Sequence, residues 1–138
     1  MPSTLNLRDF RLRKHADYQR VYQASRKQFS RQMSYFYTLR PAAAADHSGP
    51  RVGLTVGKAM GKAVDRNRIK RRMREAVRKN LPALDAPVDV ILHPRRSVID
   101  LDFVALDREI ATIFRTIQKA TQKQKAENAT ILLSNHSD

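Results

Sequence analysis

Residues 51–79 read RVGLTVGKAMGKAVDRNRIKRRMREAVRK, a strand-like segment followed by a strongly basic one. In the first part, valine and leucine alternate with glycine and threonine, and this period of two predicts a β-strand over residues 51–57. In the second part, apolar residues recur every three to four positions, which predicts a helix from about Val64 to Lys79. A strand face made of glycine and threonine leaves room for a helix or a ligand to approach.

The predicted helix presents cations in two directions. Eight of the fifteen residues from Asp65 to Lys79 are basic, and only two are acidic. A solvated helix face usually mixes both signs to form i, i+4 pairs, so this excess indicates an anionic partner. The apolar side consists of Ile69, Met73, Ala76 and Val77, the row beside it of Arg66, Lys70, Arg74 and Arg78, and the outward face of Arg68, Arg71, Arg72 and Lys79.

Length and charge narrow the class of protein. With 138 residues, 41% of them hydrophobic, the chain is long enough for one modest core and too short for two. The first 79 residues carry a net charge of +15, whereas residues 80–138 carry −1. Such asymmetry favours a polyanionic partner, nucleic acid first and an anionic membrane second. The lack of cysteine excludes disulfides and thiolate chemistry, and no apolar run is long enough to span a membrane.

The rest of the chain is organised around this segment. We expect a single domain over residues 1–125, followed by a polar C-terminal tail over 126–138 to which we assign no fold. Composition and periodicity predict a basic, mobile arm (1–13), a short helix (15–24), a strand (33–39), a loop (41–50), a buried strand (88–92) and a core-forming helix (103–123) capped by Asp102.

No set of residues in the sequence is typical of a protein-borne catalytic or metal site. The four histidines lie far apart and in no metal-ligand spacing. The segment from Gly57 to Ala63 is one residue short of a phosphate-binding loop and lacks the serine or threonine that would hold magnesium. We therefore predict neither catalytic residues nor metal ligands in this chain.

Two pairs of tyrosines suggest how nucleic acid could be recognised. Tyr18 and Tyr22 lie on one face of the first predicted helix, and Tyr35 and Tyr37 point to the same side of a predicted strand. If both faces lined one groove, single-stranded bases could stack on the rings while the cationic row contacted phosphates. The alternative is that these tyrosines are core residues. The pattern alone favours neither reading.

Three segments together resemble the protein component of bacterial ribonuclease P: DYQRVY (17–22), RVGLTV (51–56) and RNRIKR (66–71). The likeness covers about residues 6–120. It implies an α/β domain, an α+β sandwich in the order α-β-β-β-α-β-α, similar to the second domain of ribosomal protein S5. It also implies a left-handed β-α-β crossover that holds the basic helix against the central sheet, contrary to the usual right-handed rule.

The resemblance further implies a bacterial, cytoplasmic subunit, one copy per catalytic RNA, that helps to remove the 5′ leader of precursor tRNA. It implies no membrane and no small-molecule substrate. The magnesium that the holoenzyme requires would be held mainly by RNA, and the protein is expected to bind no cofactor. The implied leader-binding residues are Tyr18, Tyr22, Tyr35, Tyr37, Thr55, Lys70 and Arg74, and the implied RNA-binding residues are Lys58, Lys62, Arg66, Asn67, Arg68, Arg71 and Arg72.

One alternative stays open on the residues alone. A general RNA-binding protein of the ribosomal type, with no role in processing, would show the same basic helix and the same salt dependence of binding. A protein-only nuclease would need a cluster of carboxylates or histidines that the sequence does not offer. Precursor tRNA cleavage, tested with and without a catalytic RNA, separates these functions.

Overall fold

The computed structural model describes residues 10–41 and 49–135, which form a four-stranded sheet with three α-helices. Residues 1–9, where most of the predicted arm falls, lie outside the described part, as do residues 42–48 of the predicted loop and residues 136–138. The elements are α1 (His15–Ala24), β1 (Gln28–Phe29), β2 (Met33–Leu39), β3 (Arg51–Leu54), α2 (Ala63–Asn80), β4 (Val88–Pro94) and α3 (Phe103–Asn135), with short 3-10 turns at Lys58–Met60, Leu81–Ala83 and Arg96–Ile99.

The sheet has the strand order β1-β2-β4-β3. Strand β2 is antiparallel to both of its neighbours, whereas β3 and β4 are parallel and adjacent, and α2 connects them. This arrangement confirms the predicted element order and the β-α-β unit that contains the basic helix. It also makes β1 and β3 the two edges of the sheet.

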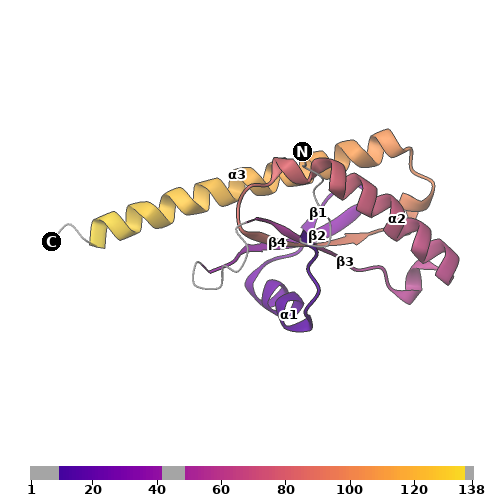
Figure 1. The fold of residues 1–138 in the computed structure, drawn as a ribbon, viewed down its shortest axis with the longest axis horizontal. Helices are drawn as coiled ribbons and strands as arrows, with labels where there is room; N and C mark the ends of the chain where they lie inside the picture. The colour runs from indigo at the N-terminus through magenta and orange to yellow at the C-terminus, as the bar shows by residue number, and fades with distance from the viewer. Residues whose placement is uncertain (1–9, 42–48, 136–138) are drawn as a thin grey trace, which may run out of the picture.

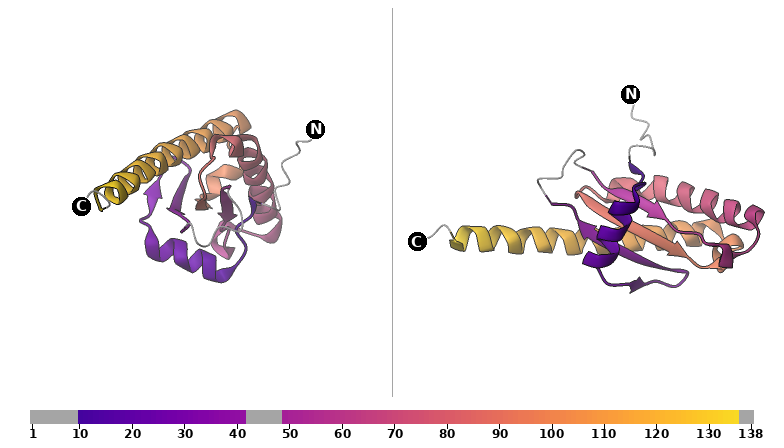
Figure 2. Two further views of the ribbon diagram at one scale, coloured as in Figure 1. Left: turned by 60° about the vertical axis from the view of Figure 1, so that its left-hand side comes forward. Right: turned by 90° about the horizontal axis from the view of Figure 1, so that it is seen from below.

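Helices cover both faces of the sheet (Figures 1 and 2). Helices α2 and α3 pack together on one face, and the main core lies between them and the sheet. Helix α1 lies across the other face, over a small cluster of Leu12, Val21 and Ile91. The two faces of the sheet therefore have different neighbours. A strand residue can contact α1 only if its side chain points to the face that α1 covers.

Helix α3 supplies much of the main core. The sequence predicted a core-forming helix here, and a stripe of five apolar side chains, spaced at helical intervals, is buried, each residue at most 2% exposed. Burial of one such large apolar side chain stabilises the fold by roughly 1.5–3 kcal/mol. The stripe consists of Leu106, Ile110, Ile113, Phe114 and Ile117.

Several predicted boundaries need correction. Helix α3 does not end near Lys123 but continues to Asn135, through most of the segment that we expected as a tail, and it extends beyond the sheet (Figure 1). Strand β3 ends at Leu54 rather than residue 57, and the two-residue strand β1 was not predicted from the pattern. Apart from the additional strand β1, these differences affect the ends of elements, and the order of the predicted elements is unchanged.

The end of the predicted N-terminal arm is part of the folded domain. Arg11 forms a parallel bridge with Val52, and the backbone N–H of Leu12 donates to the carbonyl of Val52 at 3.1 Å. The Leu12 side chain is 2% exposed, under α1. Residues 10–13 are therefore held against β3 because an apolar side chain and a backbone hydrogen bond fix them there.

Candidate nucleic-acid interface

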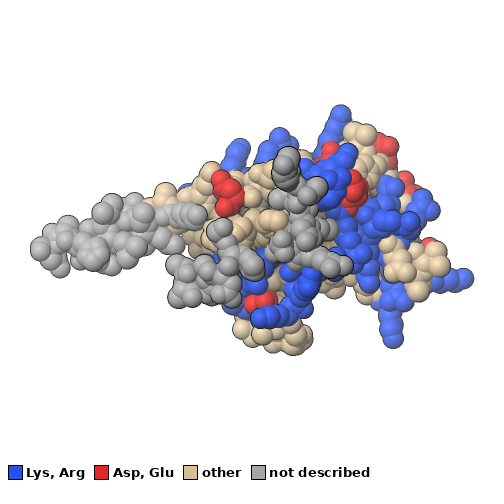
Figure 3. All heavy atoms as spheres, in the orientation of Figure 1, with Lys and Arg blue, Asp and Glu red and all other residues tan. Residues whose placement is uncertain are grey.

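Basic side chains gather over α2 and the turn that precedes it (Figure 3). The apolar side of α2 is buried against the sheet and α3, as predicted. Gly61 turns the chain into this helix with φ +121°, a left-handed conformation that favours glycine. Of the residues predicted to bind the catalytic RNA, Arg66 is half-buried, and the exposed ones are Lys58, Lys62, Asn67, Arg68 and Arg71.

Arg72 does not lie on the outward face as predicted. Its guanidinium is part-buried and donates hydrogen bonds to the carbonyl oxygens of Val98, at 3.1 Å, and Leu101. It also lies 5.9 Å from the centre of the Phe103 ring. Because its Nε and Nη2 groups bind the connection between β4 and α3, Arg72 joins two elements of the fold, and we expect it to contribute less to RNA binding than the exposed cations of α2.

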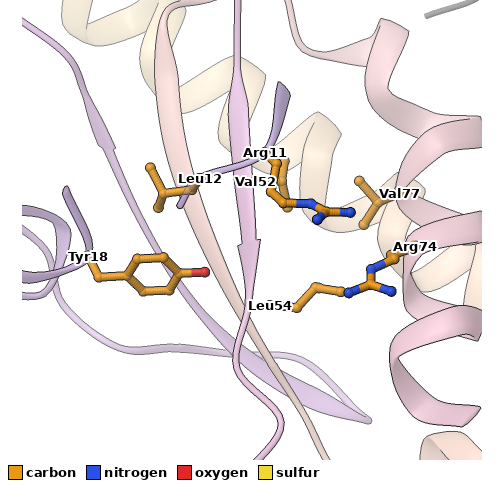
Figure 4. Close-up of a pocket in the computed structure, with 7 residues that line it drawn as sticks. All are labelled: Arg11, Leu12, Tyr18, Val52, Leu54, Arg74 and Val77. Atoms are coloured by element: carbon orange, nitrogen blue, oxygen red, sulfur yellow. The ribbon is translucent and has the colours of Figure 1, made fainter. Parts of the chain in front are cut away.

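A small pocket opens at the edge of β3, between α1 and α2 (Figure 4). Arg74 from α2, Arg11 from the N-terminal segment and Tyr18 from α1 line a space of about 90 Å³. Lys70 stands one turn before Arg74 in the same row and is half-buried. The structure thus brings Arg74 and Tyr18, both predicted leader-binding residues, to one pocket with polar and apolar walls.

Tyr18 sits closely over Gly53. A β-carbon added at Gly53 would overlap the Tyr18 hydroxyl and lie 2.7 Å from the ring carbon that carries it. The glycine face of β3 therefore permits the approach of α1, as the strand pattern suggested. Burial raises the pKa of the Tyr18 phenol above its ordinary value.

Tyr22 belongs to an aromatic cluster with Phe36 and His93. The ring centres of Tyr22 and Phe36 are 4.9 Å apart in an edge-on arrangement, and the Tyr22 hydroxyl is hydrogen-bonded to His93 Nε2 at 2.9 Å. Burial, and then the nearby charge of Lys27, lowers the pKa of His93 below its ordinary value. We call Tyr18, Tyr22, Phe36 and His93 the aromatic surface.

Tyr35 and Tyr37 lie on the opposite face of the sheet, so the prediction that all four tyrosines share one groove is wrong. Tyr35 is 6% exposed in the main core, and Tyr37 packs against the same core with its ring 6.3 Å from that of Tyr35. Burial raises the pKa of Tyr35 above its ordinary value. These two rings are core residues, and the β2 ring that reaches α1 is Phe36.

Phe36 and His93 are the residues that sequence reasoning missed. The alternation in β2 put Phe36 on the other side from the tyrosines, but the pattern did not show which side α1 would cover. His93 pairs in register with Ser34 and therefore stands on the α1 side. Thr55, a predicted leader contact, lies just past β3, where its backbone N–H donates to the Leu92 carbonyl at 3.0 Å.

A buried carboxylate holds α1 against the sheet. Asp89 of β4 is fully buried and accepts hydrogen bonds from Arg20 of α1, Arg40 after β2 and Arg51 of β3. Arg51 also pairs with Asp17 of α1 at 3.4 Å. Burial alone would raise the pKa of Asp89, but the hydrogen bonds and charges of Arg51 and Arg40 outweigh it and lower this pKa.

The described residues offer neither a cluster of metal ligands nor a membrane-spanning helix. Residues 10–41 and 49–135 contain no group of three histidine, aspartate or glutamate side chains placed to hold a metal ion. Within the same ranges, no helix has the length and apolar character needed to cross a membrane.

A small α/β domain with a cation-rich helix beside aromatic side chains on a sheet has the features of a nucleic-acid-binding protein. Comparison with known proteins shows to which family of such proteins this chain belongs. The family model described as Ribonuclease P matches residues 7–118, which is more than three quarters of the chain. The chain belongs to the ribonuclease P protein family.

Individual relatives agree with the family model. The ribonuclease P protein component of Finegoldia magna is 32% identical over 83% of this chain and 93% of its own length. The ribonuclease P protein component of an Exiguobacterium species is 36% identical over 85% of this chain and 96% of its own length. Among solved structures, a Staphylococcus aureus RNase P protein superimposes with a TM-score of 0.65 at 26% identity, covering 79% of this chain and 95% of that one. The matches thus cover more than nine tenths of the length of each of these relatives.

Proposed function

We propose that this chain is the protein subunit that binds the catalytic RNA of ribonuclease P and the 5′ leader of precursor tRNA. The observation that carries the proposal is the position of α2. Its exposed cations Arg68 and Arg71 face outward, whereas Arg74 on its flank reaches a pocket that also contains Tyr18. One helix can therefore contact two different RNA segments at once.

The leader would run from the β3-edge pocket across the aromatic surface. Bases can stack on exposed rings such as Tyr22, and the Arg74 guanidinium can bind phosphate. Mature tRNA has no leader, so these contacts would favour the precursor over the product. Discrimination of this kind would let the enzyme release its product and bind new substrate.

The hydrolytic chemistry would belong to the RNA subunit. Magnesium ions bound to RNA can activate water and stabilise the leaving oxygen, and we assign no protein residue to that step. The protein's contribution would be positive charge, which offsets phosphate repulsion and supports the folded RNA at modest magnesium concentration. We place this assembly in the bacterial cytoplasm, with one protein per RNA.

Arg74→Ala tests leader binding in the reconstituted holoenzyme. We expect at least about tenfold weaker binding of precursor tRNA, since a hydrogen bond to a charged group contributes about 1.5–3 kcal/mol, with the binding of mature tRNA unchanged. Arg115→Ala removes an exposed arginine from α3 and serves as the matched control. Equal losses for precursor and mature tRNA would contradict leader binding.

A second experiment separates this function from general RNA binding. Precursor tRNA cleavage is measured at low magnesium with the protein alone, the catalytic RNA alone, and both together. We expect cleavage only with both, giving a free leader and a 5′-phosphorylated tRNA. If the protein adds nothing to the RNA, a general RNA-binding role is favoured instead.

A further inference from the structure

One row of side chains crosses the whole sheet on the face that α1 covers. Phe29 of β1 pairs with Ser34 of β2, which pairs with His93 of β4. Thr55, just past the end of β3, continues the row. Because directly opposed residues on neighbouring strands point to the same face, Phe29 lies on the same face as the aromatic surface, at the opposite edge of the sheet from the β3 pocket.

The Phe29 side chain is unusually exposed to solvent for a phenylalanine. It is 67% exposed, more than any other aromatic residue in the described ranges. The Lys27 ammonium lies 5.6 Å from the centre of its ring. A large apolar ring left in water forgoes the stabilisation that burial would provide, and its solvent-facing side is available to stack on a planar group.

The segment around Phe29 is also rich in cations. Within the described parts of the chain, Arg26, Lys27 and Arg31 form no ion pair with a carboxylate. Glu109, which approaches this hairpin from α3, is bonded instead to the Ser30 hydroxyl and to the backbone N–H of Gln32. An exposed ring with cations that no protein carboxylate neutralises is the combination that binds single-stranded nucleic acid.

We propose that Phe29 and Lys27 form a distal subsite for the leader. A base would stack on the Phe29 ring, and the Lys27 ammonium would pair with an adjacent phosphate. This inference rests on the proposed function, in which the leader lies on this face of the sheet. The sheet edges at β1 and β3 are about 14 Å apart, given strand spacings of about 4.8 Å, so the subsite lies beyond the reach of the nucleotide held by Arg74.

The position of α2 sets the direction of the leader. Helix α2, which would face the catalytic RNA, contacts β3, at the opposite edge of the sheet from β1. Leader nucleotides nearest the cleavage site would therefore lie near Arg74, and nucleotides farther upstream would cross the aromatic surface to Phe29. The subsite would consequently be filled only by precursors with longer leaders.

A leader-length series tests this subsite. Precursor tRNAs whose leaders grow one nucleotide at a time are titrated with holoenzyme that contains wild-type protein, Phe29→Ala or Phe29→Tyr. With wild type, we expect affinity to rise until the leader reaches β1. With Phe29→Ala, the gain in affinity from the last leader nucleotides should disappear. We expect a loss of about fivefold or more in affinity for long-leader precursors, which is the lower end of the range for one base stacked on an aromatic ring. Phe29→Tyr keeps the ring and should restore it.

Two controls test whether the variant is folded and whether the loss of any surface lysine would have the same effect. Short-leader precursors should bind Phe29→Ala and wild type equally, which shows that the variant is folded. Lys27→Ala should weaken only long-leader binding, whereas Lys123→Ala, at an exposed lysine of α3, should not. If affinity never depends on the leader, the proposed function itself fails. Two other outcomes would refute the subsite alone, provided that affinity depends on the leader. In the first, Phe29→Ala binds precursors of every leader length as tightly as wild type does. In the second, Phe29→Ala binds all precursors and mature tRNA more weakly by the same factor.

Discussion

Asp89 shows how one residue can determine the geometry of the interface. Its carboxylate is fully buried, and it accepts hydrogen bonds from arginines on α1, on β3 and after β2. A buried charge of this kind is tolerated because it is paired and hydrogen-bonded. Since Arg20 is one of these partners, Asp89 also sets where α1 lies, and with it the positions of Tyr18 and Tyr22.

Asp89→Asn should therefore destabilise the protein strongly and in a pH-dependent way. We expect a loss of about 3–5 kcal/mol in the free energy of unfolding at neutral pH, because buried guanidinium groups lose their counter-charge. The folded-state pKa of Asp89 is lowered, so the stabilisation by its ionised form is complete above the unfolded-state value of about 3.9 and disappears as pH falls through the folded-state pKa.

Urea denaturation from neutral to acid pH checks this expectation. The difference between wild type and Asp89→Asn should shrink at the acid end of the series. Asp100→Asn, at an exposed aspartate, provides the control and should follow wild type throughout. A difference that stays constant with pH would show that the variant acts through packing and not through the charge of Asp89.

At the scale of elements, two adjacent arginines of α2 should behave in opposite ways. Arg72→Ala removes hydrogen bonds to the carbonyls of Val98 and Leu101, and we expect a cost of about 1.5–3 kcal/mol in the free energy of unfolding. Arg71→Ala, at the exposed neighbouring position, should change it by no more than about 0.5 kcal/mol.

Binding of the catalytic RNA gives the complementary measurement for this pair. Arg71→Ala should weaken binding of the catalytic RNA and reduce the salt dependence of that binding, since one phosphate contact is lost. Arg72→Ala should retain the affinity of wild type under conditions in which it is folded. If the Arg72 variant lost affinity as strongly as the Arg71 variant, Arg72 would bind RNA as the sequence predicted.

The elements were largely predictable from periodicity, but the faces of the strands were not. Strand β2 has the predicted bounds, because alternation over seven residues is a strong local signal. The same alternation does not show which side meets α1, so Tyr35 was assigned to the interface in place of Phe36. Arg72 was placed on the outward face for a related reason: a helical wheel does not show that the η5 turn (Arg96–Ile99) packs against the side of α2 that carries Arg72.

At the scale of the whole molecule, the fold distributes the basic half of the sequence over both edges of one sheet. Helix α2 lies beside the β3 edge, and Arg26, Lys27 and Arg31 stand at the β1 edge. Helix α3, from the nearly neutral half, supplies core residues on the other face. This arrangement explains why the charge changes so sharply along the chain: the first 79 residues form most of the proposed RNA-facing surface, and the remainder supports it.

The C-terminal part of α3 should contribute little to the stability of this domain. Thr121 is the last buried residue whose side chain is described, and the family model ends at residue 118. The described side chains after Thr121 are exposed, and most helical stability in proteins comes from packing of an apolar face. A chain that ends at Lys123 should therefore match full-length protein within about 0.5 kcal/mol in urea denaturation, with an unchanged slope against denaturant. A loss of several kcal/mol would show instead that residues 124–138 pack against the domain.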